Sequence, residues 1–206
     1  PFGSGGEKFL DEKAYPEDGR SRSMSLHNGF IRKSIDLVAP GGVVMVITTS
    51  ATMDNKNPAD REIFAKHCDL EGAIRLPNTA FSEVGTGVTA DILVLKKRET
   101  PREIGDKLPD WCYTAPNSDG LNINSYFVEN PQMILGTMKK TTHFDMLTCE
   151  PHEGKELKQE LDEACSLIET KLTIKQREQR INQQREKLQP WGKNFSYQVK
   201  DGKVYY

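Results

Sequence analysis

Cysteine is scarce in this sequence, and the few cysteines lie far apart. Only four occur among 206 residues, at Cys68, Cys112, Cys149 and Cys165. No two have the C-x-x-C spacing of a zinc ligand pair or a redox motif, and their density is far below that of a disulfide-stabilised secreted domain. The sequence therefore indicates a reduced, cytoplasmic setting.

Long apolar runs and a strong net charge are also lacking. No stretch reaches the roughly 18 apolar residues of a membrane span, and no signal-peptide pattern is present. The net charge is −2, which excludes a global basic field, so any contact with nucleic acid must be local. A late basic run at 175–193 is diluted by Glu178 and Glu186, which favours a solvated helix face over a nucleic-acid surface. The four histidines have no metal-ligand spacing, so no metal site is predicted.

The chain begins at Pro1 without a methionine and ends at Tyr206 inside a predicted strand, so we expect a fragment of a longer polypeptide. Its composition changes twice. Residues 1–100 predict a partial α/β domain, and 101–150 predict a connector anchored by aromatic residues. Residues 151–206 predict a helical segment and the start of a β-hairpin that leads to a following domain.

Two helices are predicted in the first hundred residues. Ser25 can cap the first helix, whose apolar positions recur three or four apart and form one face. Those positions are Leu26, Phe30, Ile31, Ile35 and Val38. Asn57 and Pro58 open the second helix, because proline is tolerated in the first helical turn.

Three strands are predicted around these helices. The run 43–47, VVMVI, is apolar without alternation and rich in valine, which predicts a buried parallel strand. Two further strands are predicted at 73–76 and 91–95, the second of them covered on both faces. The predicted elements follow one another as helix, strand, helix, strand and strand, which is the order in the second half of an α/β sheet domain. So few strands leave one edge of the sheet without a partner strand.

One aromatic side chain, Phe81, stands in the loop between the last two strands. Loops run over the protein surface, so an aromatic residue there requires a partner. Two interpretations are open: Phe81 anchors the core or the sheet edge, or it lines a binding site.

Three more elements are predicted after residue 100. A turn is predicted at 117–120. The apolar residues of 155–172 recur three or four apart, which predicts an amphipathic helix. Residues 195–199 and 203–206 predict a hairpin with a two-residue turn, Asp-Gly.

The first hundred residues resemble the catalytic half of S-adenosylmethionine-dependent DNA adenine-N6 methyltransferases. The family signature is (N/D)-P-P-(Y/F), often followed by glycine, and Pro1-Phe2-Gly3 looks like its tail. APGGVVMVITTSATMD, residues 39–54, is similar to the next strand and turn of the family. RLPNTAF at 75–81 and TGVTADILVLKK at 86–97 resemble its late strand pair.

The resemblance extends to a narrower group, the large methylase–helicase fusion proteins of phage and conjugative elements. WCYTAPNSDGLNINSYFVENPQMILGTM at 111–138 and SYQVKDGKVYY at 196–206 look like the segment that joins the methylase to the helicase in that group. The resemblance implies the C-terminal half of a Rossmann-like class I methyltransferase sheet, followed by a mainly helical connector.

This family resemblance also implies a pocket for a flipped adenine. Pro1 fixes the backbone so that a neighbouring carbonyl can accept an amine hydrogen, which leaves the nitrogen lone pair aimed at the sulfonium methyl. Phe2 stacks on the base, and Phe81 forms the other wall. Aromatic stacking is worth about 1–3 kcal/mol and offsets part of the cost of unstacking the base.

The implied cofactor is S-adenosylmethionine, which the family binds at a glycine-rich turn after its first strand. Gly3-Ser4-Gly5-Gly6 precedes a polar loop instead. We therefore expect the cofactor-binding half upstream, no cofactor bound by this fragment, and no methylation by the fragment alone. The implied partners are DNA, the upstream half and a downstream helicase region of the same polypeptide, with no membrane.

Another function is consistent with the same sequence. In this second reading the methylase half is degenerate, and the chain is a scaffold that docks a helicase or nucleic acid. It predicts that replacing Phe2 and Phe81 with alanine leaves function intact, whereas charge reversal at Arg177, Arg180 and Arg185 disrupts it. An unrelated nucleotide-binding α/β domain is disfavoured, because the sequence has no phosphate-binding loop.

Overall fold

The computed structural model describes residues 8–11, 22–103, 105–141, 147–168, 198–200 and 203–205. The chain divides into two compact units, residues 1–170 and 171–206. The described part of the second unit is an antiparallel hairpin, β10 (Gln198–Lys200) and β11 (Lys203–Tyr205). Lys200 pairs with Lys203, which confirms the predicted two-residue connection.

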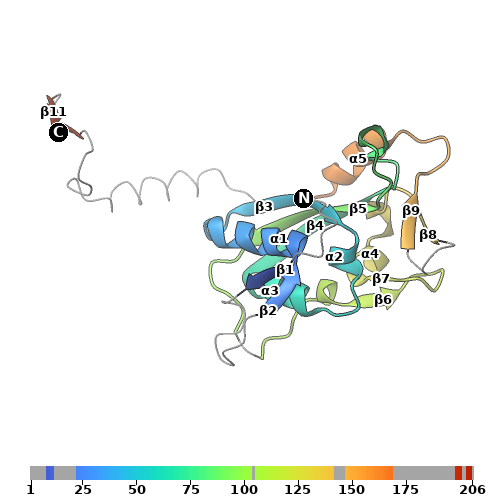
Figure 1. The fold of residues 1–206 in the computed structure, drawn as a ribbon, viewed down its shortest axis with the longest axis horizontal. Coiled ribbons are helices and arrows are strands. Elements are labelled where there is room, and N and C mark those ends of the chain that lie inside the picture. Colours follow the sequence, from blue (N-terminus) through green and yellow to red (C-terminus); the bar gives the residue numbers. More distant parts are fainter. Residues whose placement is uncertain are drawn as a thin grey trace. The chain divides into compact units, whose positions relative to one another are not determined.

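The first unit is built on a three-stranded sheet in the order β3-β5-β4 (Figure 1). These strands are β3 (Val43–Thr49), β4 (Cys68–Leu76) and β5 (Ala90–Lys97). The last of them, β5, is antiparallel to both neighbours, so β3 and β4 run in the same direction. The predicted mixed α/β fold is confirmed. The predicted parallel pairing of 43–47 is wrong for the described residues, because the strand beside it is β5, which runs the opposite way.

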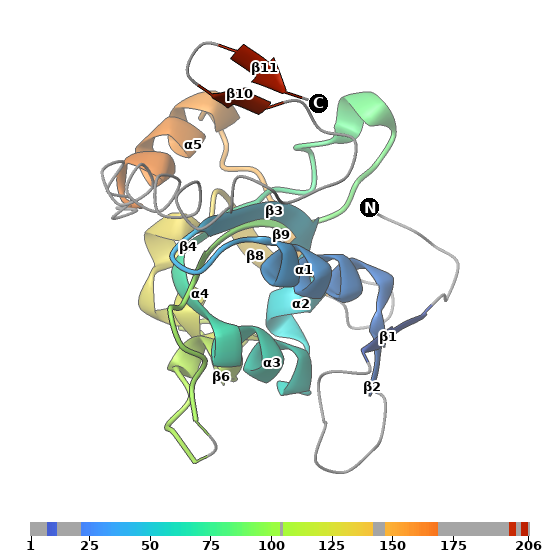
Figure 2. The same cartoon turned by 90° about the vertical axis from the view of Figure 1, so that its left-hand side faces the viewer.

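Helices lie on both sides of this sheet (Figure 2). On one side are α1 (Leu26–Leu37) and α3 (Ala59–His67), with the short α2 (Ala51–Asp54) between β3 and α3 in the chain. On the other side is α5 (Leu157–Ser166), and Ile168 just beyond it packs directly over Gly72 of β4. Met45 and Ile47 of β3 are 67% and 46% exposed on the described chain. The prediction that the 43–47 strand is buried is therefore wrong for these two side chains.

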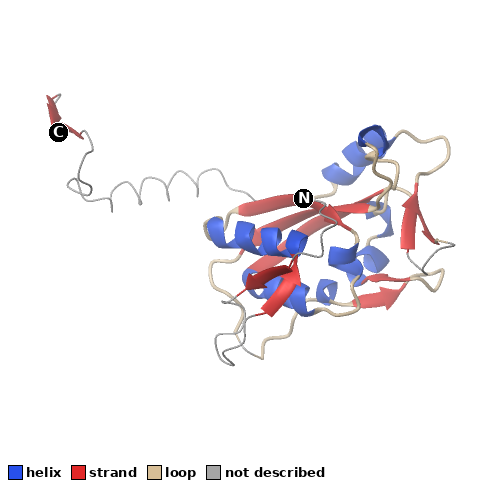
Figure 3. Cartoon of the chain, in the orientation of Figure 1, coloured by secondary structure: helices blue, strands red, loops and turns tan. Residues whose placement is uncertain are grey.

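The remaining helices and strands are short (Figure 3), and most of them follow the three sheet strands in the chain. Antiparallel pairs form between β1 (Lys8–Asp11) and β2 (Arg22–Ser25), between β6 (Thr114–Pro116) and β7 (Asn122–Asn124), and between β8 (Thr137–Lys140) and β9 (Leu147–Glu150). The helical turns are η1 (Ser82–Val84), η2 (Asp110–Cys112), α4 (Ser125–Glu129) and η3 (Pro131–Met133). Gly120 has φ 74° and its N–H donates to the Asn117 carbonyl at 3.0 Å, which confirms the predicted turn at 117–120.

One hydrophobic core joins the sheet to the segment that follows it. Its buried members include Ile31, Ile35, Phe64, Leu93 and Leu95 from the sheet and its helices, and Trp111, Ile123, Phe127, Met133 and Leu135 from the later segment. The apolar face predicted for the first helix is only partly right, because Phe30 is 52% exposed. The polar side chains of Asn28 and Arg32 are buried instead of the Phe30 ring. Asn28 forms hydrogen bonds with Thr52 of α2 and Asp60 of α3.

Within the described residues, every helix is too short or too polar to cross a bilayer.

Gly136 marks a tight contact between the ends of β8 and β9. A Cβ atom built at this position would meet the Glu150 carbonyl and would lie 2.7 Å from Cys149 Sγ. We expect Gly136→Ala to lower the free energy of unfolding by about 1–3 kcal/mol in urea denaturation, because backbone cannot yield as a flexible side chain can. Gly87→Ala is the matched control, since nothing lies within 4 Å of its Cβ position. An equal effect of the two substitutions would contradict this packing.

The four cysteines differ sharply in accessibility. Cys68, Cys112 and Cys149 are buried, whereas Cys165 is exposed. Burial raises the pKa of the Cys68 thiol to about 11, and of Cys112 and Cys149 to about 12. Because the thiolate is the reactive form, we expect a disulfide reagent to titrate one thiol quickly in native protein at pH 8 and four in denaturant. More than one fast thiol in the native protein would be inconsistent with this core.

Candidate functional site

The loops that follow β3 and β4 lie at one edge of the sheet, because the two strands run the same way. In open α/β sheets, ligands bind outside the carboxyl ends of such strands. The loop after β3 covers residues 50–58, and the loop after β4 covers 77–89. A backbone hydrogen bond joins them, from Ser50 N–H to the Thr89 carbonyl at 3.2 Å.

Phe81 lies in the second of these loops, immediately before η1. Its carbonyl accepts the N–H groups of Val84 at 3.1 Å and Thr86 at 3.2 Å, which fixes the loop backbone. The ring is half-buried and packs against the edge of the core. Pro1 and Phe2, the other predicted site residues, lie outside the described residues. The predicted base pocket between Phe2 and Phe81 therefore stays a prediction.

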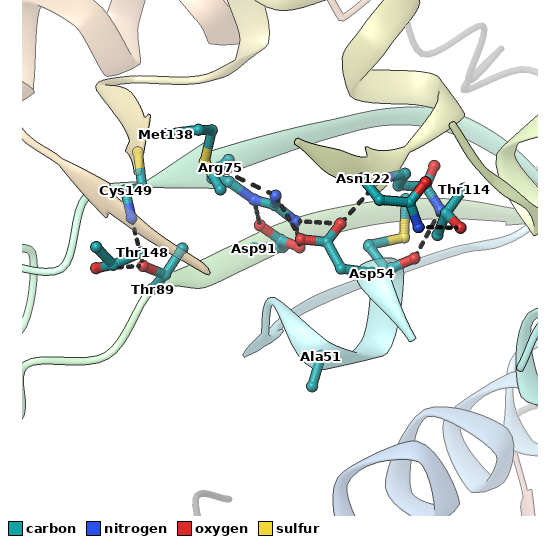
Figure 4. Close-up of polar contacts among 12 residues, drawn as sticks. Ala51, Asp54, Arg75, Thr89, Asp91, Thr114, Asn122, Met138, Thr148 and Cys149 are labelled. Atoms are coloured by element: carbon teal, nitrogen blue, oxygen red, sulfur yellow. Dashed lines mark hydrogen bonds and ion pairs between the residues drawn. The ribbon is translucent and has the colours of Figure 1, made fainter. Parts of the chain in front are cut away.

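A pocket of about 490 Å³ opens beside the loop after β3. Three separate segments form its wall: the end of β3 with α2, the β6–β7 hairpin, and the β8–β9 hairpin. The lining residues are Thr49, Ser50, Ala51, Asp54, Asn55, Lys56, Gly120, Asn122, Lys140 and Leu147. Several of them are labelled in Figure 4. We refer to this cavity as the carboxyl-end pocket.

Strand β9 connects this pocket to the Phe81 loop. Leu147, the first residue of β9, lines the pocket. Further along the strand, the Cys149 carbonyl accepts Asn78 N–H at 2.7 Å. Cys149 N–H donates to Thr89 Oγ1 at 2.9 Å (Figure 4). Since Asn78 and Thr89 stand at the two ends of the Phe81 loop, β9 holds that loop next to the pocket.

Beneath the pocket lies a fully buried arginine, Arg75 of β4, held between two carboxylates (Figure 4). Its guanidinium donates to Asp91 at 2.8 and 2.9 Å and to Asp54 at 2.7 and 3.0 Å. Its charged carbon also lies 4.3 Å from the centre of the Phe127 ring. Asp54 accepts a further bond from Asn124 N–H at 2.9 Å. These contacts fix the end of α2, and with it one wall of the pocket.

Charge pairing maintains the ionised form of this arginine. Burial alone lowers the pKa of Arg75, but the Asp91 and Asp54 carboxylates outweigh it and raise the pKa above its ordinary value. For Asp91, burial raises the pKa, and the Arg75 guanidinium opposes that shift.

A second polar cavity, of about 270 Å³, shares Ala51 and Asn55 with the first. Its other lining residues are Met24, Ser25, His27, Asn28, Asn57 and Asp60. Burial lowers the pKa of His27, against the opposing field of Asp60. Ser25 is the N-cap residue of α1, as the sequence predicted, but its side chain makes no capping hydrogen bond, and its hydroxyl lies 3.0 Å from His27 Nε2.

The sequence interpretation singled out neither Arg75 nor Asp54, and it gave Asp91 no role. A signal was present: arginine and aspartate stand inside two apolar strand patterns, and charges buried in a sheet require a partner. What the pattern lacked was the register, which places Arg75 directly opposite Asp91.

The described residues do not fit an S-adenosylmethionine site of the family type. The connections from β2 to α1, from β3 to α2 and from β7 to α4 contain no glycine, and the connection from β9 to α5 contains a single one, Gly154, so none is a glycine-rich turn. No group of three His, Cys, Asp or Glu side chains in the described ranges is placed to hold a metal ion.

Comparison with protein-family models, with curated proteins and with solved structures found no match to this chain.

Proposed function

We propose that this chain is part of an S-adenosylmethionine-dependent DNA adenine-N6 methyltransferase and supplies its base-binding side. In this proposal residues 1–100 belong to the C-terminal half of a Rossmann-like methyltransferase domain, and a flipped adenine enters beside Phe81. The rest of the parent polypeptide supplies the cofactor-binding half.

The sheet order is the observation that carries the proposal. Two strands, β3 and β4, run the same way, and the later strand β5 lies antiparallel between them. In the proposal, these three strands form the end of the Rossmann-like sheet that the sequence resemblance implies. The sheet order also brings the loop with the family-like RLPNTAF segment to the same edge as the loop that follows VVMVITT.

Phe81 supports the proposal through its chemistry and its position. The ring is only half-buried, on a loop fixed by hydrogen bonds at both ends. A ring held in this way can stack on an extruded base, which repays part of the unstacking cost.

The described residues do not fit the cofactor, which the rest of the parent polypeptide would bind. What they can do is hold the base: Phe81 offers an aromatic face, and β9 fixes the loop beside it. In the proposal, Pro1 and Phe2 supply the remaining wall and orient the amine.

A methyl-transfer assay tests this function. The parent polypeptide, extended upstream of Pro1, is incubated with unmethylated duplex DNA of mixed sequence and S-adenosylmethionine labelled in its methyl group. We expect label to enter the DNA, and DNA whose adenines are already N6-methylated serves as the control that accepts none. A folded polypeptide that binds DNA but transfers no label would contradict the proposal and favour the scaffold function.

A further inference from the structure

The two edges of the β3-β5-β4 sheet differ. At the β4 edge, the Arg75 carbonyl accepts Leu135 N–H at 2.9 Å, and Arg75 forms a parallel β-bridge with Ile134. The segment 131–135 therefore occupies this edge. At the β3 edge, no strand from the described ranges lies beyond β3. In the part of the chain that the structure describes, this second edge is open.

The backbone of β3 directs a row of polar groups to the open edge. The Gly42 carbonyl accepts Lys97 N–H at 2.8 Å. At the other end of the strand, Ser50 N–H donates to the Thr89 carbonyl at 3.2 Å. Because bonding to one neighbour alternates along an antiparallel strand, the even-numbered residues between these two positions bond β5. The odd-numbered residues point their N–H and C=O groups the other way, to the open edge. These residues are Val43, Met45, Ile47 and Thr49.

Apolar side chains continue one face of the sheet as far as this edge. Met45 lies opposite Val94 of β5, and Val94 lies opposite Gly72 of β4. Since directly opposed residues share a face, Met45 belongs to the face on which Ile168 packs over Gly72. Along this row Val94 is 2% exposed, whereas Met45 is 67% exposed. On the described chain, the cover over this face therefore stops before β3.

Strand β3 lacks the usual protection of a free sheet edge. Its seven residues, VVMVITT, contain no charge and no proline, and no bulge interrupts its register with β5. Native edge strands are short, charged, kinked or covered, because a row of unpaired backbone groups invites pairing with another chain. An uncharged, regular strand of this length is typical of one that has a neighbour on each side.

We propose that a strand from the upstream half of the parent polypeptide pairs with β3 along this edge, and that the same half covers Met45 and Ile47. This assignment rests on the proposed function, in which the cofactor-binding half and this chain share one Rossmann-like sheet. Among the described strands, β5 already has two neighbours, and the segment 131–135 occupies the β4 edge. The β3 edge is therefore the place where the upstream strands join.

Thiol labelling tests the cover over β3. Met45→Cys and Ile47→Cys are made in a Cys165→Ser background, which removes the exposed native thiol. We expect fast labelling in the 206-residue chain. In the parent polypeptide, extended upstream of Pro1, labelling should be at least about tenfold slower, because a covered thiol reacts only when its contacts open. Val84→Cys, at a loop position that is 77% exposed, is the matched control and should label equally fast in both proteins. Equally fast labelling of the β3 thiols in both proteins would overturn the proposal.

Amide hydrogen exchange distinguishes a paired strand from a covered face. The N–H groups of Met45 and Ile47 should exchange quickly in the 206-residue chain and be protected in the extended parent, because they point to the open edge. Slow thiol labelling with unprotected amides would show cover without a paired strand and would overturn the proposal. Protection in the 206-residue chain that increases with its concentration would identify the neighbour as a second copy, which would overturn it as well.

The two measurements separate this proposal from the proposed function, because neither requires turnover. An extended parent that protects β3 but methylates no DNA would refute the proposed function alone. An extended parent that methylates DNA while the β3 thiols and amides stay accessible would refute the docking of the upstream half on β3 alone.

Discussion

Replacing Arg75 with methionine is expected to lower the free energy of unfolding by about 3–5 kcal/mol, the cost of removing one partner from a buried ion pair. In the wild type the side chains of Arg75 and Asp91 are both 0% exposed. The substitution therefore leaves the Asp91 carboxylate buried without its cation. Urea denaturation measures the loss. Arg98→Met is the matched control, because Arg98 pairs with Asp69 at the surface, where such a pair is worth about 0–1 kcal/mol.

A double substitution separates charge from packing at this site. Exchanging a buried ion pair for apolar residues of similar volume is often neutral in stability. We therefore expect Arg75→Met with Asp91→Leu to recover most of the loss, since Asp54 is 13% exposed and keeps its bond from Asn124 N–H. A single variant that loses under 1 kcal/mol would show that Arg75 does not hold the end of α2.

The free energy of unfolding that Arg75→Met loses should also depend on pH. Burial raises the pKa of Asp91, and without the guanidinium nothing opposes that shift. A carboxyl group whose folded pKa is raised is stabilising below its unfolded pKa, and this contribution is lost as pH rises through the folded value. The difference in unfolding free energy between wild type and variant should therefore be small at acidic pH and grow toward neutrality.

Replacing Phe81 with alanine is expected to lower kcat/KM for methyl transfer by the parent polypeptide about 5- to 150-fold, which corresponds to about 1–3 kcal/mol of lost base stacking. The ring also packs against the core, so Phe81→Leu is the informative companion. Leucine keeps the apolar packing but has no aromatic face, and it should show nearly the same kinetic loss. Phe81→Tyr should stay close to the wild type.

The control for the Phe81 series is an exposed phenylalanine on α1. Phe30 of α1 is 52% exposed, and Phe30→Ala should leave transfer unchanged. Wild-type kcat/KM in Phe81→Ala, with the folded fraction confirmed by circular dichroism, would reduce Phe81 to a packing residue.

The burial predicted for β5 is confirmed, whereas the burial predicted for β3 is only partly right. Leu93, Val94 and Leu95 are buried as their continuous apolar run indicated, because β5 has neighbours on both edges and cover on both faces. The equally apolar β3 run leaves Met45 and Ile47 exposed. Composition reports that a strand can be buried, but it does not report which element covers it.

Polar features were harder to predict than apolar ones. The Arg75 network depends on β4–β5 register and on Asp54, which lies 21 residues before Arg75. The β8–β9 hairpin escaped prediction because TMKK and LTCE carry little apolar signal. The carboxyl-end pocket combines residues from three distant segments, and no local pattern predicts that Lys56 and Lys140 line the same cavity.

The most direct test of the base-binding role is to identify the methylated nucleoside. DNA treated with the parent polypeptide and S-adenosylmethionine is digested and analysed by mass spectrometry. The proposed function predicts N6-methyladenine, formed at a rate that falls in Phe81→Ala and Phe81→Leu and is unchanged in Phe30→Ala. Methylation of cytosine, or N6-methyladenine formed at the wild-type rate in both Phe81 variants, would contradict it.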